Sequence, residues 1–266
     1  MKRNTLFLFT SILASSVVSM DAHGTVLTGT IRDFCAPDIP GTCTRLSDFE
    51  GAVTGVTTGM VSSELNAAGL PDYVGGGIGA TNAANFAKWY VDTPGYNLST
   101  PYSLTLTETA PGSGIFSYSS SSFFPIDGEL YGNQGRSHNY HFTMHLEGQT
   151  SFKASDTFTF TGDDDLWIYI GGKLAIDLGG VHGTASKTID GADLLTLGLA
   201  EDTLYDLDVF FAERHTVGSN FTITTSFRVA PPPPPPPPPQ VPEPATLIML
   251  GIGLGGIGLA RRRRRD

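Results

Sequence analysis

Strict alternation between apolar and polar side chains in two late stretches of the chain is the feature that most constrains its fold. In residues 204–212 the odd positions from Tyr205 to Phe211 are apolar, and aspartates fill positions 206 and 208. Residues 220–229 repeat this pattern. A period of two puts the apolar side chains on one face of a β-strand and the polar ones on the other. Both stretches therefore predict strands in a sheet with one buried face.

Similar strand-like runs recur through residues 24–230. They lie at 25–33, 102–107, 115–119, 140–146, 157–160, 166–170 and 173–177. Glycine-rich segments separate several of them, and short helices are expected only in the N-terminal loops, at 60–68 and 82–90. Many short strands joined by turns indicate an all-β fold, a sandwich or a barrel. We expect residues 24–230 to form one domain.

Three consecutive aspartates, Asp163, Asp164 and Asp165, lie between the strand-like runs 157–160 and 166–170. Their mutual repulsion has to be offset by solvent or by a cation. Oxygen-rich loops favour Ca²⁺, a hard cation that takes about 6–8 oxygen ligands. The residues alone leave two interpretations open, a Ca²⁺ site and a solvated turn without a ligand.

A second polar loop, residues 213–220, joins the last two predicted strands. Asn220 offers a carbonyl oxygen to a cation, while Arg214 and His215 offer hydrogen bonds to hydroxyl groups. Together with His182, at the end of the acidic segment, they are candidate ligand-binding residues. The alternative is a hairpin connection closed by salt bridges.

The three histidines in residues 138–145 do not form one metal site. On a strand, His141 and His145 share a face but lie about 13 Å apart, and His138 points to the opposite side. We interpret them as structural or surface residues. The chain has no G-x-S-x-G and no H-E-x-x-H motif. We therefore expect a protein that is not an enzyme, although two carboxylates can still meet in space, as in glycosidases.

Both ends of the chain carry export features. Residues 1–23 combine Lys2 and Arg3 with an apolar run and small residues, the pattern of a secretory signal peptide. At the other end, a proline-rich linker at 231–240 precedes an apolar stretch, 247–260, and five arginines. That stretch is slightly short for a transmembrane span of about 20 residues, but its flanks extend it. The arginines predict a cytoplasmic C-terminus.

Export to an oxidising compartment affects the expected state of the two cysteines, and removal of both ends changes the net charge of the remaining chain. In an oxidising compartment Cys35 and Cys43 are expected to form a disulfide across a small loop, with free thiols as the alternative. Residues 24–230 hold 9 basic and 23 acidic side chains, a net charge of −14. A body this acidic repels nucleic acid, so no nucleic-acid partner is expected.

The C-terminal arrangement resembles the PEP-CTERM sorting signal of Gram-negative bacteria that produce exopolysaccharide. The motif Pro242-Glu243-Pro244, the apolar span and the basic end follow one another over residues 241–266. The resemblance implies transient anchoring in the inner membrane, cleavage by an exosortase, and release to the cell surface or extracellular matrix. A plain C-terminal membrane anchor is the alternative.

The body of the chain resembles the fibro-slime domain, a branch of the PA14 β-sandwich superfamily. The resemblance rests on the segments 86–95, 123–128, 138–143, 160–167, 172–182, 211–216 and 219–221. It implies a two-sheet antiparallel sandwich. Where such domains bind sugar, two adjacent aspartates joined by a cis peptide coordinate Ca²⁺, and the ion contacts sugar hydroxyls. This places the pair at Asp163 and Asp164, with Asn220 as a further ligand. Asp165 stands where many PA14 domains have glycine, which adds a ligand or shifts the register.

Taken together, the sequence predicts an exported, Ca²⁺-dependent carbohydrate-binding protein with an adhesin-like β-sandwich. Its metal ligands would be Asp163, Asp164, Asp165 and Asn220, and its ligand-binding residues Arg214, His215, His182 and Asn220. The expected partner is a carbohydrate or exopolysaccharide. The alternative is a structural matrix component in which Ca²⁺ only braces the loop and no sugar binds.

Overall fold

The structure is a computed structural model that describes residues 24–35, 43–51, 53–76, 81–216 and 218–234. The predicted signal peptide, the sorting motif Pro242-Glu243-Pro244 and the predicted span 247–260 lie outside the described residues. Of the linker 231–240, only the first four prolines are described.

The described residues form eleven strands and two short helices, and the described part of 43–96 is mostly loop. The strands are β1 (Gly24–Phe34), β2 (Asn97–Glu108), β3 (Phe116–Ser120), β4 (Phe142–Ser151), β5 (Thr157–Gly162), β6 (Asp165–Ile170), β7 (Lys173–Leu178), β8 (Ala185–Asp190), β9 (Tyr205–Glu213), β10 (Phe221–Thr225) and β11 (Arg228–Ala230). The helices are α1 (Ala83–Phe86) and α2 (Gly191–Thr196).

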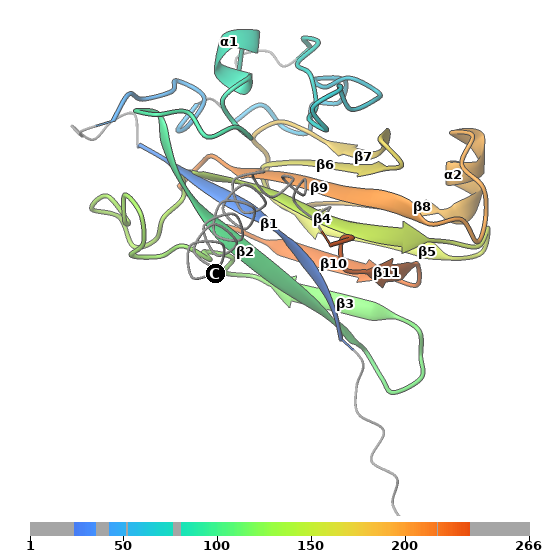
Figure 1. The fold of residues 1–266 in the computed structure, drawn as a ribbon. Coiled ribbons are helices and arrows are strands. Elements are labelled where there is room, and N and C mark those ends of the chain that lie inside the picture. Colours follow the sequence, from blue (N-terminus) through green and yellow to red (C-terminus); the bar gives the residue numbers. More distant parts are fainter. Residues whose placement is uncertain (1–23, 36–42, 52, 77–80, 217, 235–266) are drawn as a thin grey trace, which may run out of the picture. The chain divides into compact units, whose positions relative to one another are not determined.

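All strand pairs are antiparallel, and the strands follow the order β7-β6-β9-β4-β1-β2-β3-β10-β5-β8, with β11 added to β4. Only two residue pairs, Thr107 with Ser117 and Glu108 with Phe116, join β2 to β3. The strands on either side of this short junction form two layers that share one apolar core (Figure 1). The predicted all-β antiparallel sandwich is confirmed.

The shared core draws on both layers because the strands alternate as their sequences predict. Leu207, Val209 and Phe211 of β9 point into it, as do Phe221 and Ile223 of β10. Each is at most 1% exposed. Burying a large apolar side chain contributes about 1.5–3 kcal/mol, so this alternation accounts for much of the stability of the fold.

A second apolar cluster covers the outer face of β6 and β9. The segment between β1 and β2 brings Phe49, Phe86 and Trp89 onto Trp167 of β6 and Phe210 of β9. Figure 1 shows α1 and the loops around it beside β6 and β7. Asn82 caps α1 by accepting a hydrogen bond from the backbone of Asn85. A disulfide joins Cys35 and Cys43 in this segment, with Cα atoms 6.1 Å apart.

Four local predictions differ from the structure. The single strand expected at 220–229 is divided into β10, which pairs with β3 and β5, and β11, which pairs with β4. The helix expected at 60–68 is wrong: this segment is extended and forms bridges from Val61 to Tyr73 and from Glu64 to Lys173. The backbone of the segment forms hydrogen bonds with residues 70–74 and with the β6–β7 hairpin instead of the bonds of a helix. The helix expected at 82–90 is shorter, since only 83–86 is helical. The helix α2, outside the N-terminal loops, was not expected, although Asp190 and Asp193 form a capping box at its start.

Candidate functional site

The acidic triplet forms the turn between β5 and β6. β5 ends at Gly162, and β6 begins at Asp165. Asp164 has a positive φ of 53°, in the left-handed region that aspartate tolerates better than most residues. No peptide bond is cis among the described residues, so the cis bond expected between Asp163 and Asp164 is wrong. The left-handed conformation of Asp164 reverses the chain with trans bonds instead.

Asp163 lies against Asn220 because β5 pairs with β10. The register opposes Gly162 to Phe221, which puts the next residue of one strand beside the preceding residue of the other. The Asn220 backbone donates to Asp163 Oδ1, and the Asn220 side-chain amide donates to Asp163 Oδ2 at 2.5 Å. The same amide contacts Thr184 Oγ1 at 3.2 Å. Two strands far apart in sequence therefore hold this carboxylate.

Asp164 accepts two backbone hydrogen bonds, from Arg214 N at 2.7 Å and from His182 N at 3.3 Å. Its side chain is buried, and its pKa is raised to about 7. Burial is the main cause of this rise and the charge of Asp165 adds to it, while the Arg214 guanidinium lowers the pKa. A buried carboxylate of this kind is stabilised in its charged form by a nearby cation.

Asp165 and Arg214 form a fully buried ion pair. Arg214 Nε donates to Asp165 Oδ2 at 2.6 Å, and both side chains are 0% exposed. Arg214 also donates to the carbonyl of Asp48 at 3.0 Å and lies over the ring of Trp89. These contacts correct one prediction, because Arg214 belongs to the core and not to a ligand-binding rim. Asp165, a predicted metal ligand, has the Arg214 guanidinium as its partner.

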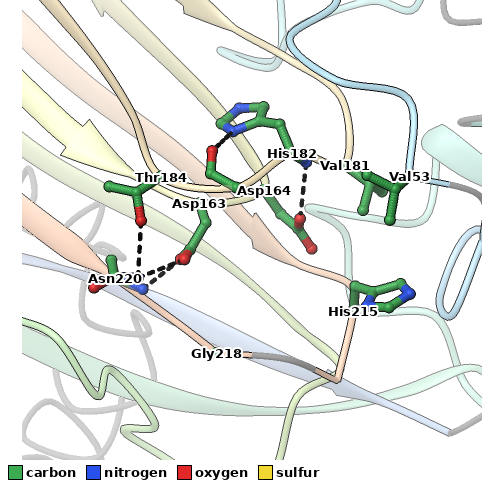
Figure 2. A pocket seen from close by; sticks show the side chains of 10 residues that line it. Val53, Asp163, Asp164, Val181, His182, Thr184, His215, Gly218 and Asn220 are labelled. Atoms are coloured by element: carbon green, nitrogen blue, oxygen red, sulfur yellow. Dashed lines mark hydrogen bonds between the residues drawn. The ribbon is translucent and has the colours of Figure 1, made fainter.

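A cavity of about 440 Å³ opens beside the two remaining aspartates (Figure 2). Its wall combines carboxylate, amide, hydroxyl, imidazole and apolar groups. The lining residues are Val53, Asp163, Asp164, Val181, His182, Gly183, Thr184, His215, Gly218 and Asn220. Of the predicted site residues, Asp163, Asp164, His182, His215 and Asn220 therefore share one cavity.

His182 lines the cavity but its ring nitrogens are engaged elsewhere. Nδ1 lies 2.8 Å from the carbonyl oxygen of Gly183, and Nε2 lies 3.1 Å from that of Leu178. Its main contribution to the site is the backbone N–H that holds Asp164. His215 lines the cavity from the loop between β9 and β10 (Figure 2).

A further acidic side chain lies behind this wall. Glu213, at the end of β9, is 1% exposed, and its Oε2 has no hydrogen-bond partner among the described residues. Burial raises its pKa well above the ordinary value, and the charge of Asp164 adds to that effect. Sequence reasoning missed Glu213, because only the fold brings it near Asp164. Carboxylates and an amide are the oxygen donors that a hard cation takes, so these residues fit Ca²⁺.

The three histidines of residues 138–145 contact three different carboxylates. His138 lies 2.6 Å from Asp127, His141 lies 2.9 Å from Glu50, and His145 lies 2.8 Å from Asp208. This arrangement agrees with the interpretation that they do not share one ion.

Two family models match the chain. Residues 127–239 match the PA14 domain, and residues 240–265 match the PEP-CTERM protein-sorting motif. The PA14 match contains the acidic triplet and all residues that line the cavity except Val53. The second indicates an exported protein. Neither description names a catalytic activity.

Several curated relatives come from Dictyostelium discoideum. Protein psiB is 33% identical over 246 residues, which cover 84% of this chain and 43% of psiB. Protein psiC is 37% identical over 203 residues, 70% of this chain and 39% of psiC. Protein psiQ is 34% identical over 206 residues, 72% of this chain and 21% of psiQ. The chain spans less than half the length of these relatives.

Solved structures with some likeness include two PA14 domains. The PA14 domain of the MpAFP antifreeze protein has a TM-score of 0.31 and 14% identity, over 48% of this chain and 74% of that chain. The PA14 sugar-binding domain from an RTX adhesin has a TM-score of 0.30 and 12% identity, over 77% of this chain and 94% of that chain. Overlaps this weak do not align individual site residues.

Among the described residues, no helix has the length and apolarity needed to cross a bilayer. The predicted span 247–260 is not among them.

Proposed function

Because residues 127–239 match the PA14 domain and residues 240–265 match the PEP-CTERM sorting motif, we propose that this exported chain is a Ca²⁺-dependent carbohydrate-binding protein. The binding site is the cavity beside Asp163 and Asp164. The observation that carries the proposal is the pair of adjacent carboxylates on the wall of a cavity in an acid-rich setting.

The charge balance of the site favours a cation. Four carboxylates gather at the turn and at the end of β9, namely Asp163, Asp164, Asp165 and Glu213. Arg214 is bonded to Asp165 and to the Asp164 turn. The raised pKa of Asp164 and of Glu213 reflects how unfavourable further negative charge is at this site without a second cation. Burying uncompensated carboxylates is costly, so a divalent cation bound by Asp163 and Asp164 would relieve the repulsion.

The size and lining of the cavity suit a sugar. Its volume of about 440 Å³ accommodates a small ligand. Thr184 and His215 offer polar groups toward hydroxyls, while Val53 and Val181 provide apolar surface for the C–H face of a sugar ring. When bound, Ca²⁺ would supply open coordination positions for vicinal hydroxyl oxygens.

Asn220 has a double role in this proposal. Its amide nitrogen now donates to Asp163 and Thr184. The amide oxygen is the group that suits a cation, so rotation of the side chain would exchange a hydrogen bond for a metal ligand. Arg214 and Asp165 support the site from the core without touching the ligand.

The proposed setting follows from the sorting motif. Exosortase processing after transient inner-membrane anchoring would deliver residues 24–230 to the surface or matrix of a Gram-negative cell. The ligand would then be a carbohydrate, with the cell's own exopolysaccharide as one source. The alternative function is a structural matrix component in which Ca²⁺ braces the β5–β6 turn and no sugar binds.

The test is Ca²⁺ titration calorimetry on the full chain, followed by a glycan array with and without chelator. Asp163→Asn and Asp164→Asn are compared with Asp92→Asn, which removes an exposed carboxylate far along the chain. We expect the first two variants to lose Ca²⁺ binding, the control to keep it, and glycan binding to vanish with chelator. Ca²⁺ binding without glycan binding would support the structural alternative. Absence of Ca²⁺ binding by the wild type would refute the metal site.

A further inference from the structure

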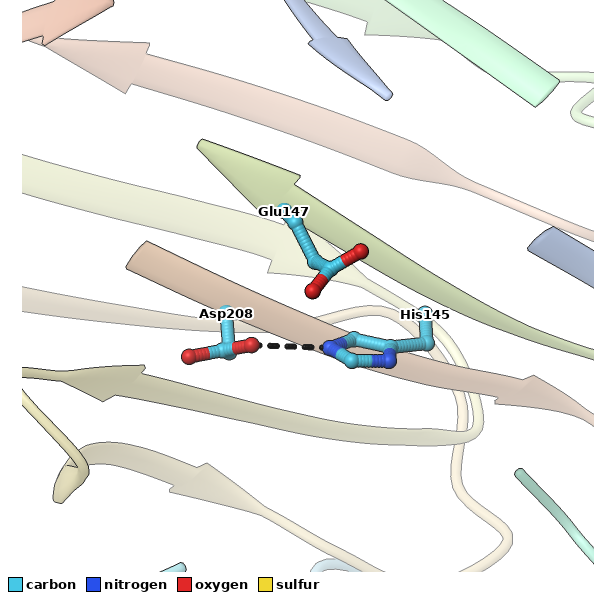
Figure 3. Close-up of side chains that lie close together, drawn as sticks. All are labelled: His145, Glu147 and Asp208. Atoms are coloured by element: carbon cyan, nitrogen blue, oxygen red, sulfur yellow. Dashed lines mark hydrogen bonds and ion pairs between the residues drawn. The ribbon is translucent and has the colours of Figure 1, made fainter. Parts of the chain in front are cut away.

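Three side chains of types that can bind a metal ion, His145, Glu147 and Asp208, lie close together (Figure 3). His145 and Glu147 lie two residues apart on β4, so both point to the same face. Asp208 lies on the neighbouring strand β9. The alternate residues Leu146 and Val209 point into the shared core, which puts these three side chains on the other side.

The ligand atoms of the three side chains already lie close together. One nitrogen of His145 and one oxygen each of Glu147 and Asp208 are within 4.8 Å of one another. His145 Nε2 is 2.8 Å from Asp208 Oδ1. The imidazole ring stacks on the ring of Phe210 with centroids 4.1 Å apart, which fixes its orientation. The side chain of Glu147 is exposed.

The strand register provides a second, independent observation. Glu147 and Asp208 are direct cross-strand partners in the β4–β9 pair. Like charges directly opposite one another destabilise an antiparallel pair. Among the described residues, neither carboxylate lies within salt-bridge distance of a lysine or an arginine. A bound divalent cation would turn this repulsion into attraction.

We propose that His145, Glu147 and Asp208 form a site for a divalent first-row transition metal, with Zn²⁺ as the probe. Bonds of about 2.0–2.2 Å from such a metal to nitrogen and oxygen place neighbouring ligand atoms about 3 Å apart. The His145–Asp208 separation is already near that value. Metal binding at Nε2 replaces the hydrogen bond between the two side chains. An imidazolium then releases its Nε2 proton to solvent, whereas a neutral imidazole carries its proton on Nδ1 with no net release.

The ligand set separates this site from the proposed Ca²⁺ site. An imidazole nitrogen suits zinc, copper, iron or nickel, whereas calcium takes oxygen ligands. Two carboxylates and a neutral imidazole carry the charge that balances one divalent ion. Three protein ligands also leave at least one coordination position for water or for a group from another molecule.

The experiment is a ZnCl₂ titration of the full chain by calorimetry, in buffer with excess Ca²⁺ so that oxygen-only sites are filled. Glu147→Gln is the central variant, because an exposed side chain can be changed without disturbing the core. His145→Gln removes the nitrogen ligand. Asp206→Asn is the matched control: it removes one exposed negative charge from β9, two residues from Asp208, but no proposed ligand.

We expect one Zn²⁺ per chain at this site in the wild type. Glu147→Gln and His145→Gln should weaken binding about tenfold or more, and Asp206→Asn by less than about twofold. Bound Zn²⁺ should also raise the melting temperature of the wild type but not of Glu147→Gln. The proposal is overturned if the wild type binds no Zn²⁺ or if Glu147→Gln binds it as tightly. It is also overturned if Asp206→Asn weakens binding as much as Glu147→Gln, which would indicate surface charge alone.

Discussion

Replacing Arg214 with methionine removes the cationic partner of Asp165 while keeping most of the side-chain volume. Both side chains are 0% exposed, and their contact is 2.6 Å long. The substitution leaves a buried carboxylate whose remaining hydrogen bond comes from the backbone of Gly180 at 2.5 Å. It also removes the hydrogen bond to the Asp48 carbonyl and the cation–π contact with Trp89.

Breaking a buried ion pair by removing one partner typically costs about 3–5 kcal/mol. We expect Arg214→Met to lower the free energy of unfolding by about 3–5 kcal/mol. The lost contacts with Asp48 and Trp89 also destabilise the fold, but their contributions are not added separately, because they belong to the same side chain. For a domain of this size, the melting temperature falls by about 2–4 °C per kcal/mol. The expected decrease is therefore roughly 6–20 °C. The double variant Arg214→Met/Asp165→Leu should recover part of it, because no unpaired charge remains.

Urea unfolding followed by tryptophan fluorescence measures these changes. Both tryptophans of the chain, Trp89 and Trp167, are buried in the cluster beside Arg214. Arg32→Met is the control, since Arg32 pairs with Asp92, which is 65% exposed. Loss of this ion pair should cost less than about 1 kcal/mol. A loss below 1 kcal/mol for Arg214→Met, or a double variant no more stable than the single one, would refute the assignment of Arg214 to the core.

Two further predictions concern pH and packing. Burial raises the pKa of Asp33 to about 7. The folded state then holds a proton that the unfolded state loses near pH 4, so stability falls as pH rises from about 4 to 7, by up to about 4 kcal/mol. Asp33→Asn should remove most of this decrease in the free energy of unfolding, measured by urea titrations at several pH values. A variant with the same pH dependence as the wild type would contradict the buried, protonated Asp33. Phe123 stacks on Phe221 at 4.7 Å in the shared core. Phe123→Ala should lower the free energy of unfolding by about 3–5 kcal/mol, measured by thermal unfolding. Phe124 is half-buried, so Phe124→Ala should lower it by only about 1 kcal/mol, and equal losses would contradict this packing.

Local patterns predicted the strands well because a strand's alternation is set by its own residues. The runs at 25–33, 166–170 and 204–212 correspond to β1, β6 and β9. The helix expected at 60–68 is wrong, because the bridges of this segment to Tyr73 and Lys173 depend on residues outside it. Where the backbone hydrogen bonds of a loop go is decided by its neighbours in space.

The candidate site divides in the same way. The acidic triplet is visible in the sequence, and the turn at Asp163 and Asp164 follows from two flanking strands. Which aspartate faces the cavity and which faces Arg214 depends on the direction of each side chain at the turn. Val53 and Thr184 carry no sequence signal for a site, because they reach the cavity wall only through the fold.

By itself, the sequence determined the all-β class, the acidic turn and the sorting signal, since periodicity, local charge and an ordered motif are properties of neighbouring residues. Tertiary structure decided that Asp165 is paired with Arg214 and that His145 meets Glu147 and Asp208. Those contacts join residues 49 and 63 positions apart. Only the pairing register of β4, β6 and β9 brings such residues within bonding distance, and no local pattern encodes that register.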